Sequence, residues 1–277
     1  MGHPRCTGFR NAVEVTSSKP EKRMPIKIGF LGSSAPSSPH HDSFRAFIPK
    51  EIVFTFSQET GDKTSLYDAR GKIAPLIAQA KELIRENAWD GLIISGAPKE
   101  ALNSGMWQRV VEEIKEPVAL ALRSSVAALK AFGSRRILLM TPVDDDLKKL
   151  YRDYLAEFEI ESLYPPQTLR AHTDAQKLTP GNVEALTHES LAKFSGVDAI
   201  YFQGALLDPL PVLQKMEVEL SLPIIASNPA MLWVILSKLD SVIAPPATEN
   251  CYPNGLSCPR ARFSCSCTCA LRIDATI

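Results

Sequence analysis

The side chains with the clearest potential for chemistry are hydroxyl and amide groups in short loops that follow predicted strands. Ser33 and Ser34 lie in one such loop, Ser95 in a second, and Ser227 with Asn228 in a third. Together with main-chain N–H groups, they could bind an anion or polarise a carboxylate, as oxyanion-type donors do. For the first loop, which is rich in Ser and Pro, a plain turn-rich connection is the alternative.

Two further residue types could take part. His40 and His41 follow the first serines, and a histidine near its ordinary pKa can move a proton; the alternative is that both lie in an exposed loop. Arg123 either pairs with a substrate carboxylate or is a solvent-facing charge at a helix start. The Asp-rich segment 144–146 is interpreted as a helix cap and not as a metal cluster.

The cysteines are confined to the two ends of the chain, and none lies between Asn11 and Asn250. The body therefore has no disulfide and no cysteine nucleophile. Residues 265–269 form a C-x-C-x-C run, but paired C-x-x-C spacing and a nearby histidine are missing. We therefore predict no metal site, and an irregular tail.

Strands and helices alternate along the chain, which predicts an α/β fold with mainly parallel sheets. Apolar runs predict strands, and helical spacing of apolar residues predicts helices. One helix, 124–133, begins with two serines suited to N-capping and ends at a glycine. The predicted strands include 26–32, 51–58, 90–95, 117–122 and 135–142, and the predicted helices include 66–87, 103–116, 143–158, 182–194 and 228–240.

An internal repeat organises these elements. Segment 89–102 matches segment 197–210, so that Asp90 pairs with Asp198 and Gly96 with Gly204, both at an offset of 108 (198 − 90 and 204 − 96). Two copies of this size predict two lobes about a pseudo-two-fold axis, with an interlobe cleft between the loops 95–97 and 203–205. The predicted organisation is an extension 1–24, a first lobe 25–134, a second lobe 135–246 and a Cys-rich tail 247–277.

Composition limits the partners. Lys plus Arg equals Asp plus Glu, 31 each among 277 residues, so nothing favours nucleic acid or an acidic membrane surface. No apolar run approaches the roughly 20 residues of a membrane span, and the N-terminus lacks the apolar core of a secretory signal. We therefore expect a cytoplasmic protein. Because G-x-G-x-x-G and P-loop patterns are absent, we expect no nucleotide cofactor.

Five segments carry a resemblance that spans about residues 26–239: IGFLGSSAP, DGLIISGAP, SSVAALKAFGSRRILLMTP, DAIYFQGALL and PIIASNPAMLW. In this order they resemble the aspartate/glutamate racemase superfamily, and most nearly its arylmalonate decarboxylase and maleate cis-trans isomerase branch. The resemblance implies two α/β lobes with the active site between them and chemistry without any cofactor. It also implies a small carboxylic acid held by loop amides and hydroxyls, with cysteine thiolates acting on the adjacent carbon.

This sequence departs from that pattern at the acid/base positions. The resemblance places Gly96 at the first-lobe thiol position and Gln203 at the second, Ala97 where a hydroxyl is expected, and Val143 where the branch has tyrosine. Gln203 could still orient a substrate by hydrogen bonds. The predicted catalytic residues are Gln203, Ser95 and His40, and the predicted substrate-binding residues are Ser33, Ser34, Gly96, Ala97, Gly204, Ser227 and Asn228.

These residues lead to a functional hypothesis with two alternatives. The leading one is a cofactor-independent lyase or isomerase, decarboxylase-like, which acts next to the carboxylate of a small organic acid or biosynthetic intermediate. A non-catalytic carboxylate-binding protein or pseudoenzyme is the first alternative, and a degraded gene product is the second. A role in secondary metabolism and a homodimer are both compatible with the sequence.

Overall fold

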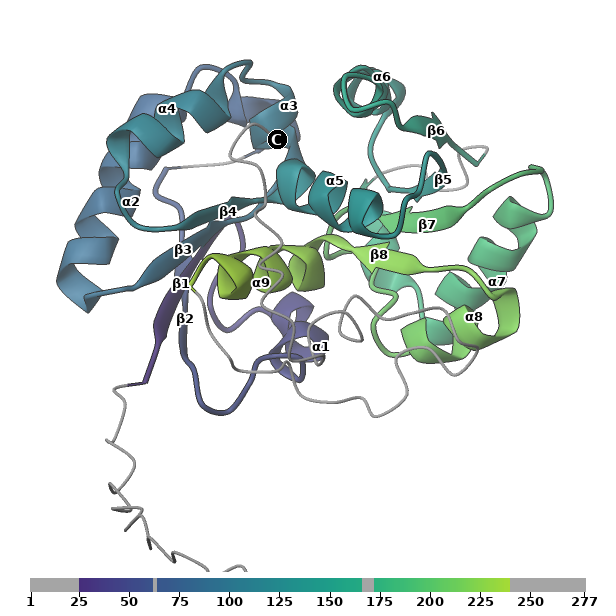
Figure 1. Cartoon of the computed structure of the whole chain (residues 1–277), viewed down its shortest axis with the longest axis horizontal. Coiled ribbons are helices and arrows are strands. Elements are labelled where there is room, and N and C mark those ends of the chain that lie inside the picture. Colours follow the sequence, from purple (N-terminus) through teal and green to yellow (C-terminus); the bar gives the residue numbers. More distant parts are fainter. Residues whose placement is uncertain (1–24, 62–63, 166–171, 240–277) are drawn as a thin grey trace, which may run out of the picture.

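The computed structural model describes residues 25–61, 64–165 and 172–239, and the predicted extension 1–24 and tail 247–277 lie outside these ranges. The described part contains two four-stranded parallel sheets, one from each half of the chain (Figure 1). The first sheet has the order β2-β1-β3-β4 and the second the order β6-β5-β7-β8. Their strands are β1 (Lys27–Gly32), β2 (Val53–Gln58), β3 (Gly91–Ile94), β4 (Val118–Leu120), β5 (Arg136–Met140), β6 (Glu161–Leu163), β7 (Ala199–Phe202) and β8 (Ile224–Ala226). The predicted two-lobed, mainly parallel α/β fold is confirmed.

Helices cover both sheets, as parallel strands that are buried on two faces require. The helical segments are η1 (Pro39–His41), α1 (Asp42–Arg45), η2 (Leu66–Ala69), α2 (Ile73–Asn87), α3 (Ala97–Ala101), α4 (Met106–Glu113), α5 (Ala121–Ala131), α6 (Asp145–Ala156), η3 (His172–Lys177), α7 (Pro180–Leu191), α8 (Leu213–Leu220) and α9 (Ser227–Lys238).

The two repeat aspartates do the same work in the two lobes. The carboxylate of Asp90 accepts a hydrogen bond of 2.8 Å from the main-chain N–H of Lys27, the first residue of β1. The carboxylate of Asp198 accepts bonds of 2.8 and 3.0 Å from the N–H groups of Arg135 and Arg136, where β5 begins. Each aspartate thus ties the start of its lobe's third strand to the start of the first, which explains why the repeat keeps it.

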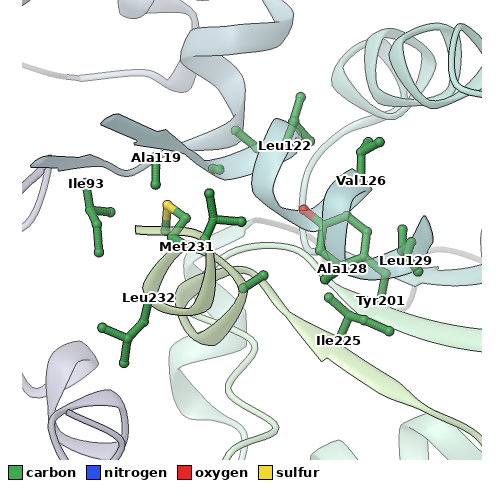
Figure 2. Close-up of a cluster of buried hydrophobic side chains, with 14 of the residues drawn as sticks. Ile93, Ala119, Leu122, Val126, Ala128, Leu129, Tyr201, Ile225, Met231 and Leu232 are labelled. Carbon is green, nitrogen blue, oxygen red and sulfur yellow. The ribbon is translucent and has the colours of Figure 1, made fainter. Parts of the chain in front are cut away.

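The lobes are joined by α5 and α9, which pack against each other between the two sheets (Figure 1). Each helix follows the last strand of one sheet and reaches toward the other, so that α9 packs on β3 and β4, and α5 packs on β8. Figure 2 shows their apolar side chains: Met231 of α9 lies near Ala119 of β4, and Val126 and Leu129 of α5 lie near Tyr201. One continuous hydrophobic core therefore crosses the lobe boundary.

Helix α5 begins earlier than the sequence predicts, and its cap is a different residue. It starts at Ala121, directly after β4, and the serines expected to cap it are buried within its first turns. Ser125 Oγ donates a hydrogen bond of 2.9 Å to the carbonyl of Ala121. The first N–H groups of the helix bind the side chain of Glu100 instead. The prediction was wrong because the helix begins directly at the end of β4, three residues before the serines, and a carboxylate from another helix binds the N–H groups of its first turn.

Candidate active site

Three of the predicted residues gather around one ammonium group at the carboxyl edge of the first sheet. Ser33 follows β1, and Ser95 with Gly96 follows β3, the neighbouring strand. The Lys99 Nζ of α3 lies 3.5 Å from Ser33 Oγ and donates to the main-chain oxygen of Ser95. The structure therefore brings these loops together, and it places at their centre a charge that the sequence analysis did not single out.

Lys99 is paired with Glu59, the residue that follows β2. Each side chain is only 7% exposed, so the ion pair is almost completely removed from water. The N–H of Glu59 donates 2.8 Å to the carbonyl of Gly32, which holds this residue beside the end of β1. Lysine and glutamate are rarely buried unless they are paired, and a buried pair is a costly way to stabilise a fold.

Gly96 leaves the room that the lysine fills. Its φ of +103° is a conformation that side chains other than glycine rarely adopt. A Cβ atom built on Gly96 would lie 2.5 Å from Lys99 Nζ, so the amine occupies the direction in which a side chain at this position would project. The N–H of Lys99 donates 3.0 Å back to the carbonyl of Gly96 and closes the turn into α3.

Glu100, the next residue, forms a second buried network that crosses the lobes. Its carboxylate accepts hydrogen bonds from the N–H groups of Leu122 at 2.5 Å and Arg123 at 3.3 Å, and from the hydroxyl of Tyr154 in α6 at 3.1 Å. Complete burial raises the pKa of Glu100 to about 7, and these donors partly offset the effect. The network belongs to the interlobe packing and to the start of α5.

Arg123 lies in this network, and its surroundings correct one of the two alternatives drawn from the sequence, the solvent-facing charge. Its guanidinium is 4.5 Å from the centre of the Trp107 ring, and Lys238 Nζ lies at the same distance from that ring. Burial lowers the pKa of Arg123, and the nearby Tyr154 and Glu100 oppose this effect. The side chain is therefore neither a fully solvent-facing charge nor a member of the Ser33–Lys99 cluster.

The first residues of the second-lobe loop, 203–205, are uncharged. Gln203 follows β7 and is 4% exposed, and its Oε1 accepts a hydrogen bond of 2.7 Å from the hydroxyl of Thr141, which follows β5. Gly204 has a φ of +96°, and a Cβ built there would meet nothing within 4 Å. The loop thus offers open space beside a glutamine whose amide oxygen is already bound. Val143, at the predicted tyrosine position, is 4% exposed and lies in the core.

Ser227 and Asn228 open α9. The hydroxyl of Ser227 lies 3.1 Å from the hydroxyl of Tyr201 and donates 3.3 Å to the carbonyl of Phe202, so it is engaged in the buried interior. Asn228 is partly exposed. Of these two predicted substrate-binding residues, the structure leaves Asn228 better placed to meet a ligand.

The predicted histidines differ in environment. His41 is 4% exposed and lies against the rings of Phe30 and Phe56, with centroids 5.7 and 4.6 Å away. Burial, followed by the nearby Arg45, lowers its pKa. The expectation that both histidines lie in an exposed loop was therefore wrong for His41, because the apolar end of the first sheet covers it. His40 is partly exposed.

The remaining predicted residues lie beside the first cluster. Ser34 is partly exposed. The methyl group of Ala97 is fully buried in the interlobe core, so that this residue could meet a substrate only through its main chain. Sequence reasoning missed Lys99, Glu59 and Glu100. One signal was available: Lys99 and Glu100 are adjacent charged residues directly after a buried strand and its loop.

Within the described ranges, one group of side chains has the spacing of metal ligands: Glu184, His188 and Glu219 on α7 and α8. Lys215 Nζ pairs with both carboxylates of this group. The group is partly exposed and satisfied by this ammonium, so we interpret it as a surface ion-pair network.

Known proteins of similar sequence and fold identify the family of this chain. A family model described as arylmalonate decarboxylase matches residues 98–250, which is more than half of the chain. The chain belongs to the arylmalonate decarboxylase family. A comparison with curated protein sequences gave no match.

Solved structures support this membership at the level of the fold. A crystal structure of arylmalonate decarboxylase matches with a TM-score of 0.65 and 19% identity, covering 79% of this chain and 94% of that one. The maleate isomerase Iso from Pseudomonas putida S16 has a TM-score of 0.62 and 16% identity, covering 78% and 93%. The maleate cis-trans isomerase from Nocardia farcinica, bound to TRIS, matches with a TM-score of 0.63 and 19% identity, covering 80% of this chain and 95% of that one.

The arylmalonate decarboxylase family membership confirms the resemblance drawn from the five segments. The relatives are a decarboxylase and isomerases, which supports the general kind of activity expected for this member. Among the described helices, none combines the length and apolar character needed to cross a bilayer.

Proposed function

We propose that this member of the arylmalonate decarboxylase family is a cofactor-independent lyase or isomerase, decarboxylase-like, which acts at the carbon next to a carboxylate of a small organic acid. The observation that carries the proposal is the cluster at the carboxyl edge of the first sheet. There the hydroxyl of Ser33, the loop of Ser95 and Gly96, and a buried ammonium meet at one place.

The chemistry follows from the types of group. A carboxylate substrate needs hydrogen-bond donors and a compensating positive charge, and both are worth more where water is excluded. Loss of CO2, or transfer of a proton next to a carboxylate, passes through an enediolate whose negative charge the same donors stabilise. In this proposal Ser33, Ser34, Ser95 and the N–H groups near Gly96 hold the substrate, and Gln203, Gly204 and Asn228 form the opposite wall.

The test is turnover by the full chain. Substituted malonates, 2-oxo acids and cis-enedioates are each incubated with the protein in deuterated water, and the products are followed by NMR. We expect loss of CO2 or deuterium incorporation with at least one class, and a slower reaction in Gln203→Ala. A folded protein that neither turns over nor binds any member of the panel would contradict the proposal.

A non-catalytic carboxylate-binding protein is the second candidate, and one observation favours it. The polar groups of the second lobe are engaged within the protein, since Gln203 Oε1 is bound by Thr141 and the Ser227 hydroxyl lies against Tyr201 and Phe202. A one-sided set of donors can hold an acid without reacting with it. Shift changes on binding of a carboxylate, without any product after prolonged incubation, would establish this candidate.

A further inference from the structure

We propose that the ammonium of Lys99 is the proton donor of the reaction, so that substrates are protonated from the first-lobe side only. This inference rests on the proposed function and deepens it, because it assigns the acid and the face. Three observations carry it: the position of the amine, its burial with Glu59, and the neutrality of the Gln203–Thr141 pair in the second lobe.

The position comes first. Lys99 Nζ lies along the direction of a side chain at Gly96, between the ends of β1 and β3. It is 3.5 Å from Ser33 Oγ, the hydroxyl that follows β1. A carboxylate that accepts a hydrogen bond from Ser33 therefore brings its neighbouring carbon close to the amine, within the short reach that proton transfer needs.

The burial argues against a purely structural lysine. Removing two charges from water costs several kcal/mol per ion, and a well-packed apolar pair is often as stable or more stable. The carbonyl of Ser95 and the carboxylate of Glu59 hold the ammonium in one place. A fixed ammonium with little access to water is well suited to give a proton to a carbanion, because bulk solvent does not compete for the reactive carbon.

The uncharged pair Gln203 and Thr141 in the second lobe indicates from which side the substrate is protonated. Gln203 and Thr141 bind each other through the amide oxygen and the hydroxyl, and neither side chain is a practical acid near neutral pH. The second-lobe loop can orient a substrate, but it offers no comparable proton. Protonation from one side predicts that a prochiral substrate gives predominantly one enantiomer.

For a substituted malonate, the proposed reaction has two bond-breaking steps. The bond between the α-carbon and one carboxylate breaks, CO2 leaves, and the electron pair stays on the α-carbon as an enediolate with the second carboxylate. An N–H bond of Lys99 then breaks, its proton forms the new C–H bond, and the product is the monocarboxylate. The neutral amine regains a proton from water before the next turnover, so the whole reaction consumes one proton and needs no oxidant or reductant.

The experiment replaces the amine and then restores it in a more acidic form. The full-chain variant Lys99→Cys is treated with 2-bromoethylamine, which converts the introduced cysteine to S-aminoethylcysteine, and the wild type is treated in parallel because it has other cysteines. We expect a loss of at least about 100-fold in kcat for the untreated variant. Treatment should restore most of this activity, and the alkaline limb of the pH–rate profile should move to lower pH.

Each other outcome is decisive. Restored activity with an unmoved alkaline limb would overturn the proton-donor role and leave Lys99 as a positioning charge. The same holds if Lys99→Cys is folded and fully active, or if the restored amine leaves it inactive. If the wild type itself binds carboxylates but turns over none, the proposed function fails, and the proton donor falls with it. A variant that is inactive beside an active wild type tests the inference alone.

Discussion

The two lobes share one scaffold but differ at the ends of their strands. Both sheets have the same strand order, and each repeat aspartate accepts main-chain hydrogen bonds where the first strand of its lobe begins: Asp90 from Lys27, and Asp198 from Arg135 and Arg136. At the carboxyl edge the first lobe carries Glu59 and Lys99 as a buried ion pair, whereas the second carries the neutral pair Thr141 and Gln203.

The residues that support the scaffold and the residues proposed for the chemistry are therefore under separate constraints. The aspartates serve the strands of their own lobe, so both copies need them. An acid or base serves a reaction, and a reaction that needs only one proton transfer needs only one such group. A one-sided site fits decarboxylation or isomerisation better than racemisation, which requires a group on each face of the substrate.

Substitutions of Lys99 and Gln203 should differ most in their effect on kcat. Lys99→Met should lower kcat by at least about 100-fold, because it removes a general acid. Gln203→Ala should cost about tenfold or less, the value of one neutral hydrogen bond. NMR rates of CO2 release on the same malonate measure both. A larger loss of kcat in Gln203→Ala than in Lys99→Met would contradict the proposed difference between the lobes and would assign the reactive group to the second lobe.

The next effect compares two acidic residues at repeat-related positions. Glu100→Ala should lower the free energy of unfolding by about 2–4 kcal/mol, since it leaves the buried N–H groups of Leu122 and Arg123 without an acceptor. Asp208→Ala is the matched control, because Asp208 accepts one bond of 3.0 Å from Leu210 and is part-buried, and it should cost about 1 kcal/mol or less. Urea denaturation measures both, and equal losses would contradict the proposed role of Glu100 as the cap of α5.

A smaller effect is the pH dependence that Glu100 imposes on the first lobe. Its folded pKa is about 7 and its ordinary value is 4.5, so between these values the folded protein binds more protons than the unfolded chain. The contribution of this group to stability is therefore fully present below about pH 4.5 and is lost as pH rises to 7. Relative to Glu100→Gln, the wild type should lose on the order of 2–3 kcal/mol over this range. Urea midpoints at several pH values provide the test, and a constant difference between the two proteins would refute the prediction.

Substitution of the two repeat aspartates should have the smallest effect on stability. Asp90→Ala and Asp198→Ala should each lower the free energy of unfolding by about 1 kcal/mol, because each loses bonds to the start of a strand. The loss should be somewhat larger for Asp198→Ala, because Asp198 accepts from the N–H groups of both Arg135 and Arg136, and kcat should not change in either variant. A change in kcat in one variant alone would show that the lobes differ in more than their loops.

The architecture could be predicted from the amino-acid sequence alone. Alternation of strand and helix patterns and the 108-residue offset were sufficient to predict two parallel α/β lobes. Both features can be detected along the chain without knowing which residues contact each other. It also predicted that Asp144 caps a helix, and Asp144 Oδ1 accepts 3.0 Å from the N–H of Leu147 at the start of α6. The loops that carry Ser33, Ser95 and Gly96 were predicted too, since strand ends are visible in the sequence.

The identity of the charges that meet in those loops depends on long-range packing and could not be predicted from the sequence. Glu59 and Lys99 lie on different elements 40 positions apart (99 − 59), and they pair because β2, β1 and β3 are neighbours in one sheet. Glu100 caps α5, and His41 lies under the phenyl rings of the first sheet, for the same reason. Periodicity reports how a segment is buried, whereas the partner of a buried charge depends on which strand ends and helices are packed together.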